Sequence, residues 1–403
     1  MQNEKIATRV AYGRALAALG EKYDFFVMDA DLSGSTQTAM FGKKFPERFA
    51  NCGIAEENMV STAAGIASTG LPVFVSSFAM FACGRAYEQI RNSVAYPRLN
   101  VKIAASHAGV TVGEDGATHQ FCEDMALMRS LPNMTVVNPA DATEAFAAVE
   151  AILNYNGPVY FRLGRYAVPV VFDPAGYRFE LGKGRVLRDG KDAVIFATGI
   201  MVAAALEAGE LLAAEGIDAA VVNIHTLKPL DEPLVLEYAA KTGRVVTAEE
   251  HTVIGGLGGA VAELLSEKLP TRMKRVGVND CFGKSAPAKD ALNLHGLNAG
   301  IFVDRGGLRL GQVHGKHRFN LPDLGFHAGV DGIRRFPVPF LFNDRIHGIG
   351  DARPEPAVIL GFFPAFRGEA RQIQYDAQRN DSAADPDNFS AQNAVPLPWG
   401  IPE

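Results

Sequence analysis

Apolar and polar positions follow two alternating patterns over the first 170 residues. Short apolar runs predict buried strands at 23–28, 71–76, 101–105, 135–137 and 158–162. Between them, apolar residues recur at helical spacing, which predicts helices at 5–20, from Glu56 onward, at 85–96, 123–129 and 141–153. Strands and helices that alternate with short connections are typical of a parallel sheet with helices on both faces.

The alternation lapses over 171–184, where Pro174 and Gly176 predict a linker. A second alternating block follows, with strands expected at 193–197, 218–222, 244–247 and 274–278 and helices at 199–215, 256–268 and 288–295. We therefore expect an α/β protein with two successive open sheets. The first domain covers 1–170, the linker 171–184, and a smaller second domain 185–299.

Residues 300–403 form an irregular tail that is rich in proline, phenylalanine and arginine, and no period persists in it. Its polar stretch 376–393 has the composition of a disordered segment. Two interpretations stay open. The tail is either a fused accessory segment or an aberrant extension from a frameshift or read-through, since the second domain breaks off in mid-helix near 297–299.

Composition and charge argue against several classes of function. The net charge of −6 gives no basic footprint for nucleic acid or an anionic membrane. The N-terminus lacks the apolar region of a signal peptide, and the most apolar run, 73–83, is too short to span a bilayer. The cysteines have no paired spacing, which favours a reducing cytoplasm and neither a disulfide framework nor a zinc site; they are Cys52, Cys83, Cys122 and Cys281.

Clusters of polar residues, one of which includes two phenylalanines, follow four predicted strands of the first domain. These are the strands at 23–28, 71–76 and 101–105 and a short strand that ends near residue 51. Because ligands bind at the carboxyl ends of strands in open parallel sheets, we expect these residues to share one site. They are Asp29, Asp31 and Ser35, then Glu56, then Ser76, Ser77, Phe78 and Phe81, and finally Ser106, His107 and a loop that includes Asp115 and His119. Taken alone, Glu56 has a second interpretation as a carboxylate that caps its own helix. Phe78 and Phe81 are expected in a loop, where they would form a flat wall for a planar heterocycle.

Three stretches carry a resemblance to a known family. They are Asn-Cys-Gly-Ile-Ala-Glu-Glu-Asn-Met-Val at 51–60, Phe-Ala-Met-Phe at 78–81, and Val-Gly-Glu-Asp-Gly-Ala-Thr-His-Gln at 112–120. In sequence and order they resemble the pyrimidine-binding domain of transketolases, which use thiamine diphosphate. The resemblance extends over residues 1–299 and implies that the second domain is similar to the transketolase C-terminal domain.

The resemblance implies a role for each candidate residue. It assigns the cofactor to Glu56, Asp31, Phe78 and Phe81, with Glu56 bound to the aminopyrimidine ring and the two phenylalanines holding it. A tyrosine that follows in the family is replaced here by Gly84. Asp115 is expected to bind a ketose hydroxyl, while His107 and His119 transfer protons or bind the sugar carbonyl and hydroxyls. The sugar phosphate is assigned to Arg9, Ser35 and Arg165, with Arg162 as the alternative to Arg165.

One element of the family is missing. Thiamine enzymes hold the diphosphate and its Mg²⁺ with a Gly-Asp-Gly motif, which does not occur in this sequence. The resemblance therefore implies one subunit of a split transketolase. An N-terminal partner subunit would supply the Mg²⁺ site, the cofactor would lie at the interface of a dimer of heterodimers, and this subunit would be inactive alone. Its own residues are expected to bind no metal.

The resemblance further implies a mechanism. Protonated Glu56 would favour the imino tautomer of the aminopyrimidine, and a two-carbon ketol unit would pass between sugar phosphates. Related activities stay open: that of a deoxyxylulose phosphate synthase, or of a 2-oxo acid dehydrogenase β subunit. The pair His107 and His119 favours a sugar substrate over an acyl pocket. A third alternative is a non-catalytic assembly or regulatory subunit.

Overall fold

The structure is a computed structural model that describes residues 4–304 of the 403-residue chain. The expectations for the tail from residue 305 onward lie outside these residues. At the start of the expected tail, α12 (Ile301–Asp304) continues the second domain.

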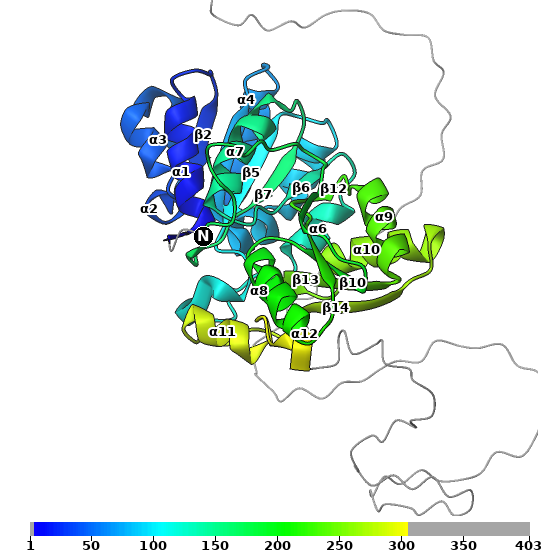
Figure 1. Cartoon of the computed structure of the whole chain (residues 1–403). Helices are drawn as coiled ribbons and strands as arrows, with labels where there is room; N and C mark the ends of the chain where they lie inside the picture. The colour runs from blue at the N-terminus through cyan, green and yellow to red at the C-terminus, as the bar shows by residue number, and fades with distance from the viewer. Residues whose placement is uncertain (1–3, 305–403) are drawn as a thin grey trace, which may run out of the picture. The chain divides into compact units, whose positions relative to one another are not determined.

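A seven-stranded sheet lies at the centre of the first domain (Figure 1). Its order is β12-β6-β7-β5-β4-β2-β3, and all neighbours are parallel except β12 and β6. The strands are β2 (Phe26–Asp29), β3 (Phe49–Asn51), β4 (Val73–Phe78), β5 (Val101–Ser106), β6 (Thr135–Val137), β7 (Val159–Arg162) and β12 (Thr226–Lys228). Short β1 (Lys5–Ile6) and β8 (Val168–Pro169) pair separately as an antiparallel ribbon.

Helices cover both faces of this sheet because its strands are apolar on both sides. On one face, α1 (Thr8–Leu19) and α7 (Ala142–Asn154) pack against side chains such as Phe74. On the other face, α4 (Glu56–Ala67) and α6 (Asp124–Ser130) pack with Val73 and Val75. Alternate residues of β4 therefore belong to different cores, as the two-residue period of a strand requires.

Some connections differ from the expected ones. One helix was predicted at 85–96, but the helical segment starts earlier and is not a regular α-helix. It is π-helical over Met80–Arg85 and Ile90–Ala95, with α5 (Tyr87–Gln89) between these stretches. A π-turn changes which way the side chains of a helix face, and such turns are frequent at functional sites. Short α2 (Ser33–Thr36) and α3 (Ala39–Lys44) were not predicted. Each has too few residues to show a helical period.

The second sheet has the order β14-β13-β10-β11-β9, and only β9 is antiparallel to its neighbour. Its strands are β9 (Arg185–Arg188), β10 (Ala193–Ala197), β11 (Ala219–Asn223), β13 (Arg244–Thr252) and β14 (Arg272–Val278). Its helices are α8 (Met201–Ala214), α9 (Glu232–Thr242), α10 (Leu257–Lys268), α11 (Ala288–Leu294) and α12. The α/β fold with two successive sheets is thus confirmed, while β9, β12 and α9 were missed.

The two sheets share structure as well as a linker. Between β11 and α9 the chain leaves the second sheet, and β12 pairs with β6 at the edge of the first sheet. One apolar core includes Val75 and Ile103 of the first sheet together with Val194 and Phe196 of the second. The packing of the first domain therefore depends on residues that follow the linker.

Candidate functional site

Glu56 is the first residue of α4, and its side chain is only 1% exposed. Its carboxylate does not cap the helix; instead it faces β4 and the π-helix that follows. Ser77 Oγ donates a hydrogen bond to Glu56 Oε1 (3.3 Å), and Arg85 forms an ion pair with Oε2. The capping interpretation is therefore wrong. A carboxylate this deeply buried needs a charged or hydrogen-bonding partner, and Arg85 supplies one here.

Two aromatic side chains lie next to this ion pair. Phe78 and Phe81 are nearly parallel, with ring centroids 6.0 Å apart and an interplanar angle of 16°. The guanidinium carbon of Arg85 lies 4.9 Å from the Phe81 centroid, at cation–π distance. The expectation of a loop at this position is wrong, because β4 continues to Phe78 and Phe81 lies on the π-helix. Regular backbone therefore fixes both rings.

His107 extends the aromatic cluster from the end of β5. Its ring stacks on Phe78 at a centroid distance of 3.7 Å, and its Nδ1 lies 2.9 Å from Ser106 Oγ. The backbone of His107 has a positive φ of 57°, a strained conformation that the surrounding structure must stabilise. Burial, together with the charges of Arg9, Arg165 and His119, lowers the pKa of His107 to about 3. His107 is therefore neutral near pH 7, which favours hydrogen bonding over proton transfer among its two expected roles.

The loop 109–120 brings His119 to the same cluster and Asp115 to Arg165. A 3₁₀-helix over Val110–Asp115 is interrupted at Gly113, whose φ is 87°. The ring of His119 meets Phe81 edge-on, with centroids 5.4 Å apart at 81°. Asp115 is exposed, and its Oδ2 lies 3.7 Å from Arg165 Nη1. We define the site cluster as Glu56, Phe78, Phe81, His107 and His119.

Two arginines lie beside the site cluster. Arg9 of α1 donates to the backbone carbonyl of Ser35, and Arg165 donates to that of Val112. Burial and the charge of Arg165 both lower the pKa of Arg9. Two guanidinium groups held near each other in this way favour an anion between them. The side chain of Arg162, in contrast, is buried and donates to Asp124 Oδ2 (2.6 Å) and Oδ1 (3.2 Å). Of the two alternatives, the geometry favours Arg165.

Asp29 and Asp31 have different environments although both follow β2. Asp29 is buried and accepts hydrogen bonds from Thr36, Thr38 and the backbone of Leu32, so it fixes the turn that carries Ser35. Burial raises its pKa. Asp31 is exposed and bonds to Asn51 through backbone and side chain, at 3.0 and 3.2 Å. It joins the ends of β2 and β3 and does not enter the site cluster through any of these contacts.

Sequence reasoning missed Arg85 and a buried charged group that joins the two domains. In that group, Asp124 accepts hydrogen bonds from Arg162 and from Tyr160 Oη, and His251 Nε2 lies 3.9 Å from Asp124 Oδ1. Burial opposes ionisation of Asp124, but Arg162 and His251 outweigh it and hold the pKa of Asp124 below its usual value. The sequence contained one signal: Arg162 ends an otherwise apolar strand, where a charge requires a buried partner.

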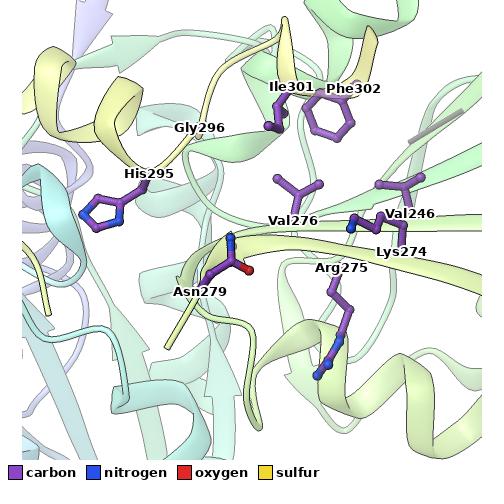
Figure 2. A pocket seen from close by; sticks show the side chains of 10 residues that line it. Val246, Lys274, Arg275, Val276, Asn279, His295, Gly296, Ile301 and Phe302 are labelled. Carbon is purple, nitrogen blue, oxygen red and sulfur yellow. The ribbon is translucent and has the colours of Figure 1, made fainter. Parts of the chain in front are cut away.

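Other features of residues 4–304 lie away from this site. A small cavity of about 60 Å³ lies in the second domain. Figure 2 shows that Ile301 and Phe302 lie over Val246 and Val276 in its lining. Its walls are both apolar and polar, and they contain none of the predicted site residues. In this part of the chain, no three His, Cys, Asp or Glu side chains converge as metal ligands. None of its helices has the length and apolar character needed to cross a bilayer.

Comparison with known proteins identifies relatives of both domains. Residues 4–170 match the family model "Transketolase, pyrimidine binding domain", and residues 182–300 match "Transketolase, C-terminal domain". A protein described as a transketolase C-terminal section from Methanocaldococcus jannaschii is 53% identical over 74% of this chain and 94% of its own length. A 6-deoxy-6-sulfo-D-fructose transketolase subunit from Clostridium sp. (strain MSTE9) is 47% identical over 68% of this chain and 86% of its own.

A solved structure agrees with these matches. It is described as a split-gene transketolase in an inactive β4 tetramer, with 56% sequence identity and a TM-score of 0.70. The match covers 75% of this chain and 97% of that one. The described fold of this chain is therefore that of a transketolase subunit.

Proposed function

This chain belongs to the transketolase family, and we propose that it is the subunit of a split, thiamine diphosphate-dependent transketolase that becomes active with an N-terminal partner subunit. The observation that carries the proposal is the convergence of a buried carboxylate, two parallel phenyl rings and two imidazoles. It lies at the carboxyl ends of parallel strands, where open sheets bind ligands.

The residues present fit the aminopyrimidine half of the cofactor. Glu56 offers a buried carboxyl group for a ring nitrogen, and Phe78 and Phe81 offer flat apolar surfaces for a planar ring. When bound, thiamine diphosphate supplies the electron sink for cleavage of a carbon–carbon bond. The carboxyl group of Glu56 donates a hydrogen bond to the ring when it is protonated, which requires Arg85 to release it.

The sugar-binding residues have separate roles in this proposal. His107 is neutral and orients a sugar carbonyl or hydroxyl through a hydrogen bond, while His119 moves protons and Asp115 binds a hydroxyl. Arg9 and Arg165, with Ser35, hold the phosphate group. Asp31 is assigned to the cofactor only by the resemblance, since its own contacts are to Asn51.

We propose that the partner carries the diphosphate site and its Mg²⁺, and that the assembly is a dimer of heterodimers in the cytoplasm. The support for a partner is that this chain matches nearly the whole of a split-gene relative, whose β4 tetramer is described as inactive. The support for a reducing compartment is that all four cysteines are free thiols.

The test combines this chain with a partner that bears the Gly-Asp-Gly motif. We expect the mixture, but neither chain alone, to bind thiamine diphosphate in calorimetry and to transfer ketol units between sugar phosphates. Glu56→Gln and Glu56→Ala should abolish turnover of the mixture. Normal turnover in these variants contradicts the assignment of Glu56. No heat of binding from the mixture favours a non-catalytic assembly subunit.

A further inference from the structure

The loop that carries Asp115 and His119 is held by the second domain at two points. At the first, Glu250 of β13 accepts a hydrogen bond from the backbone N–H of Thr111 at 2.6 Å. Glu250 is only 2% exposed. Burial raises the pKa of Glu250 to about 7, so its carboxyl group is not fully ionised near neutral pH. The strength of this contact lies in its burial, because loss of the acceptor leaves the backbone N–H of Thr111 without its partner.

Gly109 shows how closely Glu250 approaches this loop. A Cβ atom at position 109 would lie 2.4 Å from the carboxyl carbon of Glu250, and the φ of Gly109 is 82°. Any other residue at this position would displace the carboxylate and strain the backbone. The start of the loop is thus shaped to receive a side chain from the other domain.

The second point of attachment is Gln120, at the end of the loop. Its Nε2 donates to the carbonyls of Val110 (3.1 Å) and Gly113 (3.1 Å) within the loop and to Lys284 (3.0 Å) in the second domain. Gln120 Oε1 is buried and comes so close to Gly283 that a Cβ there would lie 1.8 Å away. One amide group therefore joins both ends of the loop to the segment before α11.

Strand β13 is itself fixed against the first domain beside Glu250. Arg162 donates to the backbone carbonyl of Glu250 at 2.8 Å, and the N–H of Thr252 donates to the carbonyl of Cys122 at 2.8 Å. These bonds hold the carboxylate at a defined position relative to the sheet that carries the site cluster. A displacement of the loop by about 1 Å can reduce catalysis by about 100-fold, because reacting groups must meet in a narrow range of geometries.

We propose that Glu250 and Gln120 are positioning residues, through which the second domain fixes the loop so that Asp115 and His119 face the substrate. This inference deepens the proposed function and rests on it for its kinetic part. It gives the second domain, which contributes no residue to the site cluster, a part in the reaction.

The variants are chosen so that loss of the hydrogen bond can be told from a change in packing. Glu250→Ala removes the acceptor, whereas Glu250→Gln keeps an oxygen for Thr111. Gln120→Glu keeps the shape but removes the amide donors. Glu249→Gln is the matched control, because Glu249 is a buried neighbour on β13 whose carboxylate instead accepts from the N–H groups of Leu257 and Gly258 at the start of α10.

The first measurement is amide hydrogen exchange of the full-length chain alone. In Glu250→Ala and Gln120→Glu, we expect exchange within 109–120 to be about 10- to 100-fold faster than in the wild type, because each variant loses a buried hydrogen bond that holds the loop. Glu250→Gln and the control Glu249→Gln should exchange at nearly the wild-type rate. If Glu250→Ala does not fold, the isosteric Gln120→Glu carries the test.

The second measurement uses the complex with the partner. We expect KM for the ketose phosphate to rise about tenfold or more in Glu250→Ala and Gln120→Glu, with the affinity for thiamine diphosphate unchanged in calorimetry. Unchanged exchange in both variants overturns the positioning role, and so does faster exchange with an unchanged KM. If the wild-type complex shows no transketolase activity, the proposed function fails, while the exchange result still decides whether the second domain holds the loop.

Discussion

Arg85 forms an ion pair with Glu56, and its guanidinium group also lies over the ring of Phe81 at cation–π distance. Glu56 is buried whereas Arg85 is 40% exposed, so the arginine can leave for water but the carboxylate cannot. Arg85 therefore compensates the buried charge of the Glu56 carboxylate until another hydrogen-bonding group takes its place.

This asymmetry predicts a measurable coupling between the two residues. In urea unfolding of the isolated chain, a double-mutant cycle of Arg85→Met and Glu56→Gln should give a coupling energy of about 1–2 kcal/mol, less than for a fully buried pair because Arg85 is partly solvated. The control cycle, Arg129→Met with Glu263→Gln, removes a pair with an exposed carboxylate, and its coupling should be below about 1 kcal/mol. Equal coupling in both cycles contradicts the prediction.

His107 should influence the rate without setting its pH dependence. Because burial and neighbouring cations lower its pKa to about 3, it stays neutral from about pH 5.5 to 8.5. His107→Asn should reduce kcat/KM for the ketose phosphate by about 100-fold through loss of orientation. The shape of the profile of kcat/KM against pH should stay the same. A titration that disappears in this variant would show that His107 exchanges protons near neutral pH.

The arginines beside the site cluster should discriminate phosphorylated from unphosphorylated sugars. Arg9→Ala or Arg165→Ala removes a charged donor, so kcat/KM for a ketose phosphate should fall by about 10- to 100-fold. Activity with the matching unphosphorylated ketose should change little. Arg14→Ala is the control, because Arg14 is an exposed arginine on the same helix as Arg9. An equal loss with both sugars contradicts a role in phosphate binding.

Donor specificity separates the related activities. The two imidazoles near Phe78 and Phe81 suit a polyol, so ketose phosphates should serve as donors in the complex with the partner. Pyruvate should give less than about 1% of that rate, the discrimination expected when buried polar groups lose their partners. Turnover with pyruvate at a similar rate would instead support a synthase-like or dehydrogenase-like activity.

Acid should destabilise the chain through a buried histidine outside the site. Burial, followed by the charge of Arg185, lowers the pKa of His225 to about 3. The unfolded chain therefore binds the proton more readily, and stability is lost as pH falls below about 6.5. Between about pH 7 and about pH 5.5, the unfolding free energy of His225→Gln should fall by about 1 kcal/mol less than that of the wild type. Identical losses in urea unfolding would show that His225 does not contribute.

Much of the fold could be predicted because its signals are local. Apolar runs and helical periods identified β2, β4, β5, β6, β7, β10, β11, β13 and β14 and most of the long helices. The polar and aromatic residues at or after the ends of β3, β4 and β5 identified the members of the site cluster. What could not be predicted depends on contacts between distant segments: Gln120 and Lys284 are 164 positions apart. The ion pair of Arg85 depends on the π-turn of 80–85, which leaves no distinct apolar period.

Strand β12 has a consequence for how the chain can be divided. A polypeptide that stopped at the linker would leave β6 without its antiparallel neighbour. An exposed edge strand of this kind can pair with strands of other chains and cause aggregation. Exchange of the C-terminal half with that of a relative would likewise replace part of the first sheet. A division of the chain between the two halves would therefore separate strands that belong to one sheet.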